Sequence, residues 1–148
     1  MALVAQSALA ARIINSAKLN GVSNVTVTPS ATVLTYVNVT TTGSGSAARW
    51  RCTNITVQGQ TPILNNHPDH DGAGNYVELL NITAPAAPGT YAVSFIAYDN
   101  DLCTGSPSNT VNLVEGITVQ NIVPEFTYVS ALLGLALVAG MFVVMRKK

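Results

Sequence analysis

Short runs in which apolar and polar residues alternate make up most of the chain between residues 12 and 119. Successive side chains of a strand point to opposite faces, so this alternation predicts half-buried β-strands. Glycine, proline, serine, asparagine and aspartate separate the runs, as is typical of turns. The runs cover residues 12–19, 24–27, 32–39, 48–57, 76–82, 91–97 and 111–119. About seven short strands, each with one solvent-exposed face, predict an all-β fold in which two antiparallel sheets form a sandwich.

Two of these runs break their own alternation. Trp50 and Ile55 are both apolar but have opposite parity, and Leu79 and Leu80 are adjacent. Because a slip of one residue turns every side chain to the other face, the pattern predicts bulges or bends near Thr53 and at Leu79–Leu80.

A different pattern begins after residue 125. Residues 126–145 are twenty residues without a charge, followed at once by Arg146, Lys147 and Lys148. A helix of that length spans roughly 30 Å, the thickness of the hydrocarbon layer of a membrane. The pattern predicts one C-terminal transmembrane helix, with the basic residues 146–148 as a cytoplasmic tail that anchors the topology and the bulk of the chain outside. The alternative is a buried core helix.

The first eleven residues are apolar and contain Ala-Leu-Ala, which fits the small-residue rule for signal-peptide cleavage. They lack the basic stretch that begins a complete signal peptide. Residues 1–11 are therefore interpreted as a residual signal peptide or as an N-terminal arm, and a short first helix is a further alternative.

Composition narrows the class of protein. Charged residues make up only 9% and hydrophobic residues 48% of the 148 residues, and the formal net charge is zero. Disordered chains are poor in apolar residues and rich in net charge, so a disordered protein is excluded. A nucleic-acid partner is not expected, because no basic stripe exists.

The chain has two cysteines, Cys52 and Cys103. Outside the cell they should pair, and a closed loop of about 50 residues would stabilise the fold by about 4 kcal/mol in the chain-entropy model. The alternative is two free thiols.

Four Asn-x-Thr triplets are candidate glycosylation sites: Asn24, Asn38, Asn54 and Asn81. Each asparagine has the parity opposite to that of its apolar neighbours, which predicts that its side chain points outward. The alternative is exposed polar residues that are never modified.

Four of the seven acidic residues gather in two loop segments, Asp69 and Asp71 in one and Asp99 and Asp101 in the other. Alternate aspartates can present oxygen ligands, so these four residues are a candidate calcium site, with calcium the single cofactor considered. The alternative is that they serve as turn residues.

Pro124, Glu125 and Phe126, followed by the apolar span and the basic terminus, resemble the PEF-CTERM sorting signal of archaeal surface proteins. The resemblance implies recognition by a membrane sorting transpeptidase, an archaeosortase, which is believed to cleave near the Pro-Glu-Phe box and transfer the protein to a lipid anchor.

The body of the chain is similar to the immunoglobulin-like domains of secreted prokaryotic proteins, most closely in residues 85–101, PAAPGTYAVSFIAYDND. Tyr91 resembles the corner tyrosine of such sandwiches, the alternative being an ordinary core aromatic. The resemblance implies an immunoglobulin-like β-sandwich over residues 12–119, joined by a linker and sorting box, residues 120–125, to the membrane segment.

No nucleophile elbow, zinc-protease, P-loop or dinucleotide motif occurs in the sequence, so no enzyme activity is expected. The leading hypothesis is a cell-surface structural or adhesive module, held by membrane lipid and able to join a surface layer or self-associate. One alternative is an extracellular calcium- or glycan-binding module. The other is a filament subunit that assembles by strand addition.

Overall fold

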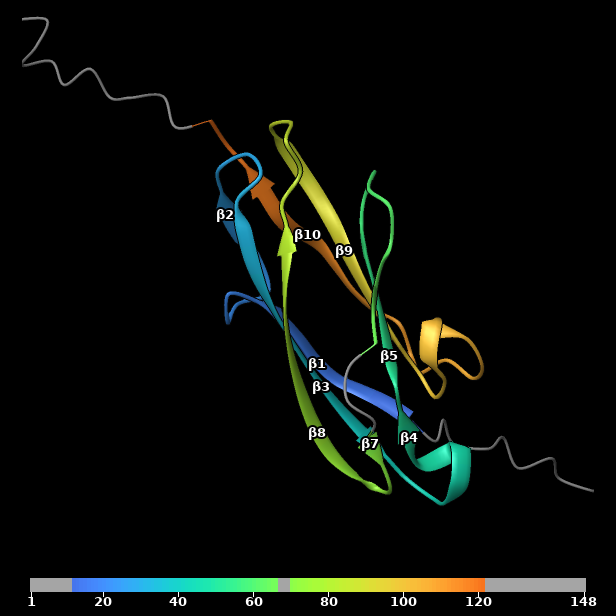
Figure 1. Cartoon of the computed structure of the whole chain (residues 1–148). Coiled ribbons are helices and arrows are strands. Elements are labelled where there is room, and N and C mark those ends of the chain that lie inside the picture. Colours follow the sequence, from blue (N-terminus) through green and yellow to red (C-terminus); the bar gives the residue numbers. More distant parts are fainter. Residues whose placement is uncertain (1–11, 67–69, 122–148) are drawn as a thin grey trace, which may run out of the picture.

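The protein is described by a computed structural model over residues 12–66 and 70–121, which form two β-sheets packed face to face (Figure 1). The three-stranded sheet has the order β1 (Arg12–Leu19), β3 (Thr32–Thr41), β8 (Gly74–Thr83). The five-stranded sheet has the order β2 (Val25–Val27), β10 (Val111–Val119), β9 (Gly89–Tyr98), β5 (Cys52–Val57), β6 (Ile63–Asn65). All neighbours are antiparallel except β2, which lies parallel to β10.

Three smaller features gather at one end of the sandwich. A two-stranded ribbon joins β4 (Arg49–Trp50) to β7 (His70–Asp71). Of two short 3₁₀ turns, η1 (Gly45–Ala48) immediately precedes β4 in the β3–β4 connection, and η2 (Asp101–Cys103) lies in the β9–β10 connection against β5 and β6.

The core lies between the two sheets and takes alternate residues from both. Its fully buried members include Leu19 and Val33 from the three-stranded sheet and Ile55, Phe95 and Ile117 from the five-stranded sheet. The predicted all-β sandwich is thus confirmed, and the alternating runs form the strands because their apolar halves face this core.

Two segments divide differently from the prediction. The run predicted at residues 48–57 is split at Arg51 into β4 and β5, and the stretch of residues 58–74 contains β6 and β7 instead of being only a loop. Each of these extra strands has two or three residues, too few for alternation to be recognised.

The bend predicted near Thr53 corresponds to the break at Arg51, where the chain passes from the β4–β7 ribbon into β5 of the five-stranded sheet, so Trp50 and Ile55 both reach the core despite their opposite parity. The pairing of β5 with β9 runs without a shift through Thr53. The bulge predicted at Leu79–Leu80 is wrong, because β8 pairs with β3 without a shift along its whole length and Leu79 is simply exposed.

The observed bulges lie elsewhere. The β1–β3 register shifts between Ile14 and Ser16, and the β10–β9 register shifts between Leu113 and Ile117. In the second bulge, a Cβ on Gly116 would approach Val93 Cγ2 to 2.9 Å, so the close approach of the two strands requires glycine there.

An Asn-Gly turn follows β1. Asn20 and Gly21 both have positive φ, at 49° and 84°, and Leu19 and Val22 exchange backbone hydrogen bonds of 2.7 and 3.0 Å. This is the geometry of a tight type I′ turn, which Asn-Gly favours. After the turn the chain leaves the three-stranded sheet and enters the five-stranded sheet as β2.

The described chain enters and leaves at opposite ends of the sandwich (Figure 1). Arg12 lies at the end that holds β4 and β7, and β10 runs away from that end towards residue 121. In residues 12–66 and 70–121 no helix is long and apolar enough to cross a membrane. The predicted span at residues 126–145 lies outside the described residues.

Candidate functional site

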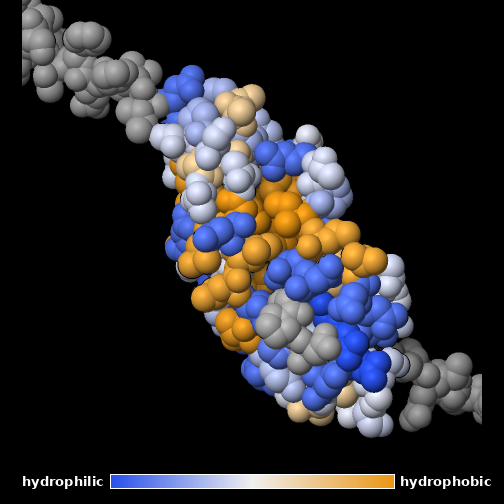
Figure 2. Space-filling model, in the orientation of Figure 1, coloured by the Kyte–Doolittle hydropathy of each residue, from blue (hydrophilic) through white to orange (hydrophobic). Residues whose placement is uncertain are grey.

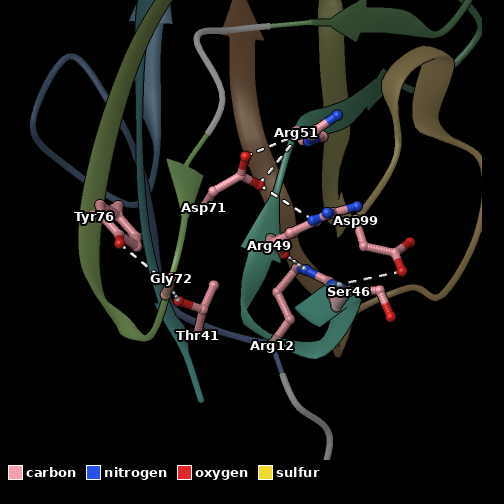
Figure 3. Close-up of polar contacts among 9 residues, drawn as sticks. All are labelled: Arg12, Thr41, Ser46, Arg49, Arg51, Asp71, Gly72, Tyr76 and Asp99. Carbon is pink, nitrogen blue, oxygen red and sulfur yellow. Dashed lines mark hydrogen bonds and ion pairs between the residues drawn. The ribbon is translucent and has the colours of Figure 1, made fainter. Parts of the chain in front are cut away.

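A network of charged and polar side chains lies at one end of the sandwich, here called the β4–β7 end (Figure 3). It comprises Arg12, residues 42–51, residues 70–73 and the β9–β10 connection at residues 99–110.

Arg12 is the first described residue and is buried, with only 2% of its surface exposed. Its guanidinium donates to three backbone carbonyls: Nε to Arg49, Nη1 to Ser106 at 2.7 Å and Nη2 to Ser46 at 3.1 Å. Asp99 supplies the counter-charge, with its Oδ2 3.9 Å from Nη2. One side chain therefore holds together the start of β1 and two loops.

These contacts of Arg12 with three carbonyls and Asp99 are here called the Arg12 clamp. Its electrostatics follow from the burial of Arg12 and Asp99. Loss of hydration lowers the pKa of Arg12 from its ordinary value, and the nearby Asp99 carboxylate acts in the opposite direction. Asp99 is 6% exposed, and its Oδ1 also accepts a 2.8 Å hydrogen bond from the backbone N–H of Ser106. The pair is satisfied by its own neighbours, as buried charges must be.

A second, more exposed ion pair holds the β4–β7 ribbon. The Asp71 carboxylate lies 2.9 Å from Arg51 Nη2 and 3.3 Å from Arg49 Nε. The hydrogen bond from Arg51 is the largest cause that lowers the pKa of Asp71 below its usual range, and the charges of both arginines add to it.

Aromatic rings stack behind this ribbon. His70 lies between Trp50 and Tyr76, with ring centroids 5.2 and 4.3 Å away. Its Nε2 lies 2.6 Å from Glu78 Oε1, and buried Trp50 donates from Nε1 to Thr53 Oγ1 at 3.0 Å. The ribbon is thus fixed on both of its faces.

Cys52 and Cys103 form a disulfide, with Cα atoms 5.0 Å apart, as the sequence predicts. The bond ties the first residue of β5 to η2, where Leu102 and Cys103 have positive φ of 59° and 53°. Neither residue type favours that conformation, so the bridge fixes a strained loop tip.

Of the four candidate calcium ligands, the three in the described residues have different surroundings. Asp71 is engaged by Arg49 and Arg51, Asp99 belongs to the Arg12 clamp, and Asp101 is exposed in η2. Asp69 lies outside the described residues. Within residues 12–66 and 70–121, no three His, Cys, Asp or Glu side chains are placed to hold a metal ion. Calcium binding stays a prediction.

The four sequon asparagines face away from the core. Asn24 and Asn81 are exposed, and Asn38 and Asn54 are half-buried. The Oδ1 atom of Asn38 accepts a hydrogen bond from Asn15 Nδ2 at 2.7 Å, and that of Asn54 accepts one from Thr56 at 3.3 Å. The predicted orientation is confirmed, and modification stays a prediction.

Tyr91 lies at the opposite end of the sandwich, near the start of β9. Its hydroxyl donates a 2.9 Å hydrogen bond to the carbonyl of Ala87, four residues upstream. This is the contact that defines a tyrosine corner.

Other predicted functional residues lie outside the described part of the chain. They are the sorting-box residues Pro124, Glu125 and Phe126 and the basic residues Arg146, Lys147 and Lys148.

Sequence reasoning missed the Arg12 clamp, although one signal was present. Arg12 has the same strand parity as Ile14, which is buried, so the alternation placed its side chain inward. Its three acceptors are backbone carbonyls, which carry no sequence signature.

No protein-family model matches the chain, and no curated protein is significantly similar to it in sequence. The fold, the positions of its side chains and the sequence are therefore what support a function.

Proposed function

We propose that the chain is a non-enzymatic cell-surface module, an immunoglobulin-like domain that is exported and held at a membrane by its C-terminal segment. The observation that carries this proposal is the direction of the chain: residue 121 leaves at the end of the sandwich opposite to the β4–β7 end (Figure 1). A membrane segment that follows residue 121 would present the disulfide-linked loops outward.

The strand order supports the immunoglobulin-like class. In constant-type domains strands A, B, E and D form one sheet and C, F and G the other. Here β1, β3 and β8 correspond in order to A, B and E, and β5, β9 and β10 to C, F and G. The Tyr91 corner lies at the start of the strand that corresponds to F, as in that class. The disulfide differs, because it joins β5 to η2 instead of linking the two sheets.

Two features support a location outside the cell. Disulfides persist in oxidising compartments, and the Cys52–Cys103 bridge accounts for both cysteines of the chain. The sequon asparagine Asn24 is exposed, where a glycan can be attached without disturbing the core.

The β4–β7 end is built for rigidity. Its charged groups Arg12, Asp71 and Asp99 are committed to one another and to backbone carbonyls. This favours a structural or adhesive role over the calcium-binding alternative, which needs carboxylates with free lone pairs.

The test is intact-mass spectrometry of the protein from native membranes, with and without reduction. We expect loss of mass from the tail near Pro124–Phe126, a lipid or glycan increment, and a gain of two hydrogen atoms on reduction. A variant with Pro124, Glu125 and Phe126 all changed to alanine should keep its tail and serves as the control. An unmodified 148-residue mass for the natural chain would contradict sorting and anchoring.

A further inference from the structure

The two sheets of the sandwich have four edges. In the described residues, β8 forms a long edge that pairs with β3 on one side and with no strand on the other. The edge strands are β1 and β8 in one sheet and β2 and β6 in the other. Both β2 and β6 have only three residues, and β1 carries a bulge and the exposed Lys18 and packs against β9 and β10. Short length, bulges and lysines are among the means by which proteins protect edges from pairing.

β8 has none of these three protections. It runs for ten residues, Gly74–Thr83, in unbroken register with β3, and it contains no proline and no lysine. Its one charged residue, Glu78, points inward; an inward charge can also protect an edge, but Glu78 Oε1 already has a partner in His70 Nε2 of the same copy, 2.6 Å away. In the described part of the chain no strand lies beyond β8, at the position that strand D takes in a constant-type domain.

The face beside this edge is apolar. Leu79 is 57% exposed and Val77 45%, and Leu34 on the adjacent β3, paired with Asn81, is 40% exposed. Figure 2 shows apolar surface over β8, continuing across this side of the molecule. An unprotected strand edge flanked by exposed apolar side chains is suited to adding another strand.

We propose that β8 pairs antiparallel with β8 of a second copy of this chain, around a two-fold axis at Leu79. A two-fold interface brings the same edge of both copies together and closes on itself, giving a dimer and not a filament. The two three-stranded sheets become one continuous sheet of six strands, with the apolar side chains of both copies side by side.

The charges select the register. Residues opposite each other must share a face, so the axis of a nearly full-length pairing lies at Leu79 or at Glu78. An axis at Glu78 would set two carboxylates opposite each other, which is unfavourable. An axis at Leu79 sets leucine against leucine, and Val77 against Asn81 of the second copy.

The direction of pairing has a functional consequence, which rests on the proposed surface anchoring. Antiparallel β8 strands place the two sandwiches head to tail, so their residue-121 ends point in opposite directions. Two copies anchored through their C-terminal segments would then belong to two facing surfaces. The dimer is a homophilic contact between surfaces.

Cysteine cross-linking tests the pairing in the full chain, purified in detergent. Both natural cysteines are held in the disulfide, so an introduced cysteine is the one free thiol. We expect Leu79→Cys to form a disulfide-linked dimer on mild oxidation. Val77→Cys should do so when mixed with Asn81→Cys but only weakly alone. Val114→Cys, exposed on β10, is the matched control and should stay monomeric.

Three outcomes would overturn the pairing. They are no more dimer from Leu79→Cys than from Val114→Cys, a monomeric natural chain at all concentrations in sedimentation equilibrium, or open polymers in place of a dimer. Leu79→Lys should abolish the dimer, and Val114→Lys should leave it intact.

Vesicle clustering tests the facing-surface geometry. The full chain with a C-terminal histidine tag is bound to vesicles that contain a nickel-chelating lipid, so the native anchor is not required. We expect vesicles to cluster with the natural sequence and with Val114→Lys, and not with Leu79→Lys. Dimers that form only within single vesicles would overturn the contact between surfaces. Anchoring itself is tested separately by the mass measurement, so the two failures are distinguishable.

Discussion

At the scale of single residues, the strongest constraint is the charge of Arg12 in a nearly dry site. Its guanidinium has a fixed fork of donors that match the carbonyls of Arg49, Ser46 and Ser106. Lysine would offer a point charge and could not reach all three. Three carbonyls in the loops of the β4–β7 end are therefore joined through one side chain.

Replacing Arg12 with methionine should destabilise the fold by about 3–5 kcal/mol, because it leaves the buried Asp99 carboxylate without its counter-charge and removes a donor from three backbone carbonyls. The measurement is the free energy of unfolding from urea titration. Lys18→Met, an exposed change on the same strand, is the control and should stay within about 0.5 kcal/mol of the natural chain. A loss for Arg12→Met as small as that of the control would contradict the clamp.

Asp71 makes stability depend on pH in the acid range. Its pKa is lowered in the folded state by Arg51 and Arg49, so its contribution is fully present above the unfolded-state pKa of about 3.9. The contribution is lost as pH falls through the lower folded-state pKa. We expect the natural chain to be more stable than Asp71→Asn at pH 6 and the difference to shrink below about pH 4.

Unfolding by urea at a series of pH values measures this difference. Because the pair is exposed, added salt should reduce the advantage of the natural chain at pH 6. A difference between the two proteins that is the same at pH 2 and pH 6 would rule out the Asp71 carboxylate as its source.

At the scale of elements, alternation identified the strands wherever it ran long enough. β3 and β9, with ten residues each, were predicted because their buried residues alternate strictly. β6 and β7 were missed because two or three residues show no period.

The bulge wrongly predicted at Leu79–Leu80 has a physical cause too. The alternation rule treats every apolar residue as inward, but Leu79 is left exposed. The change of parity between Trp50 and Ile55, by contrast, marks a real break between β4 and β5. The candidate site was harder to predict than the fold, because the partners of Arg12 lie 34 to 94 residues away in sequence.

The disulfide, which ties η2 to β5, should stabilise the fold. The bridge closes a separation of 51 residues, for which the chain-entropy model gives about 4 kcal/mol. We expect a double Cys52→Ala, Cys103→Ala variant to lose up to that amount in urea titration. Reduction of the natural chain should give a similar loss and should leave the double variant unchanged. Equal stability with and without reductant would contradict the prediction.

At the scale of the whole molecule, the sandwich is a spacer between its two ends. β3 alone, with ten residues at roughly 3.3 Å each, separates them by about 30 Å. Ser44 is exposed at the β4–β7 end, and Ala86 is exposed at the opposite end, in the connection between β8 and β9.

The proposed orientation predicts different distances from the membrane for these two residues. Dyes on Ser44→Cys and Ala86→Cys, measured by energy transfer to an acceptor lipid in the native membrane, should show much weaker transfer from residue 44. Equal transfer would mean that the sandwich lies flat on the surface, and stronger transfer from residue 44 would reverse its orientation.

The Arg12 clamp also sets a time order for folding. Arg12 is among the first residues of the domain to be synthesised, whereas its acceptor Ser106 comes 94 residues later, and Asn109 bonds to Ile14 across 95 residues. During synthesis Arg12 is present long before these partners, so β1 cannot complete its native contacts until nearly the whole domain has left the ribosome. Contacts of such sequence separation slow folding. For the export that we propose, this unfolded interval would leave the chain able to pass through an export channel.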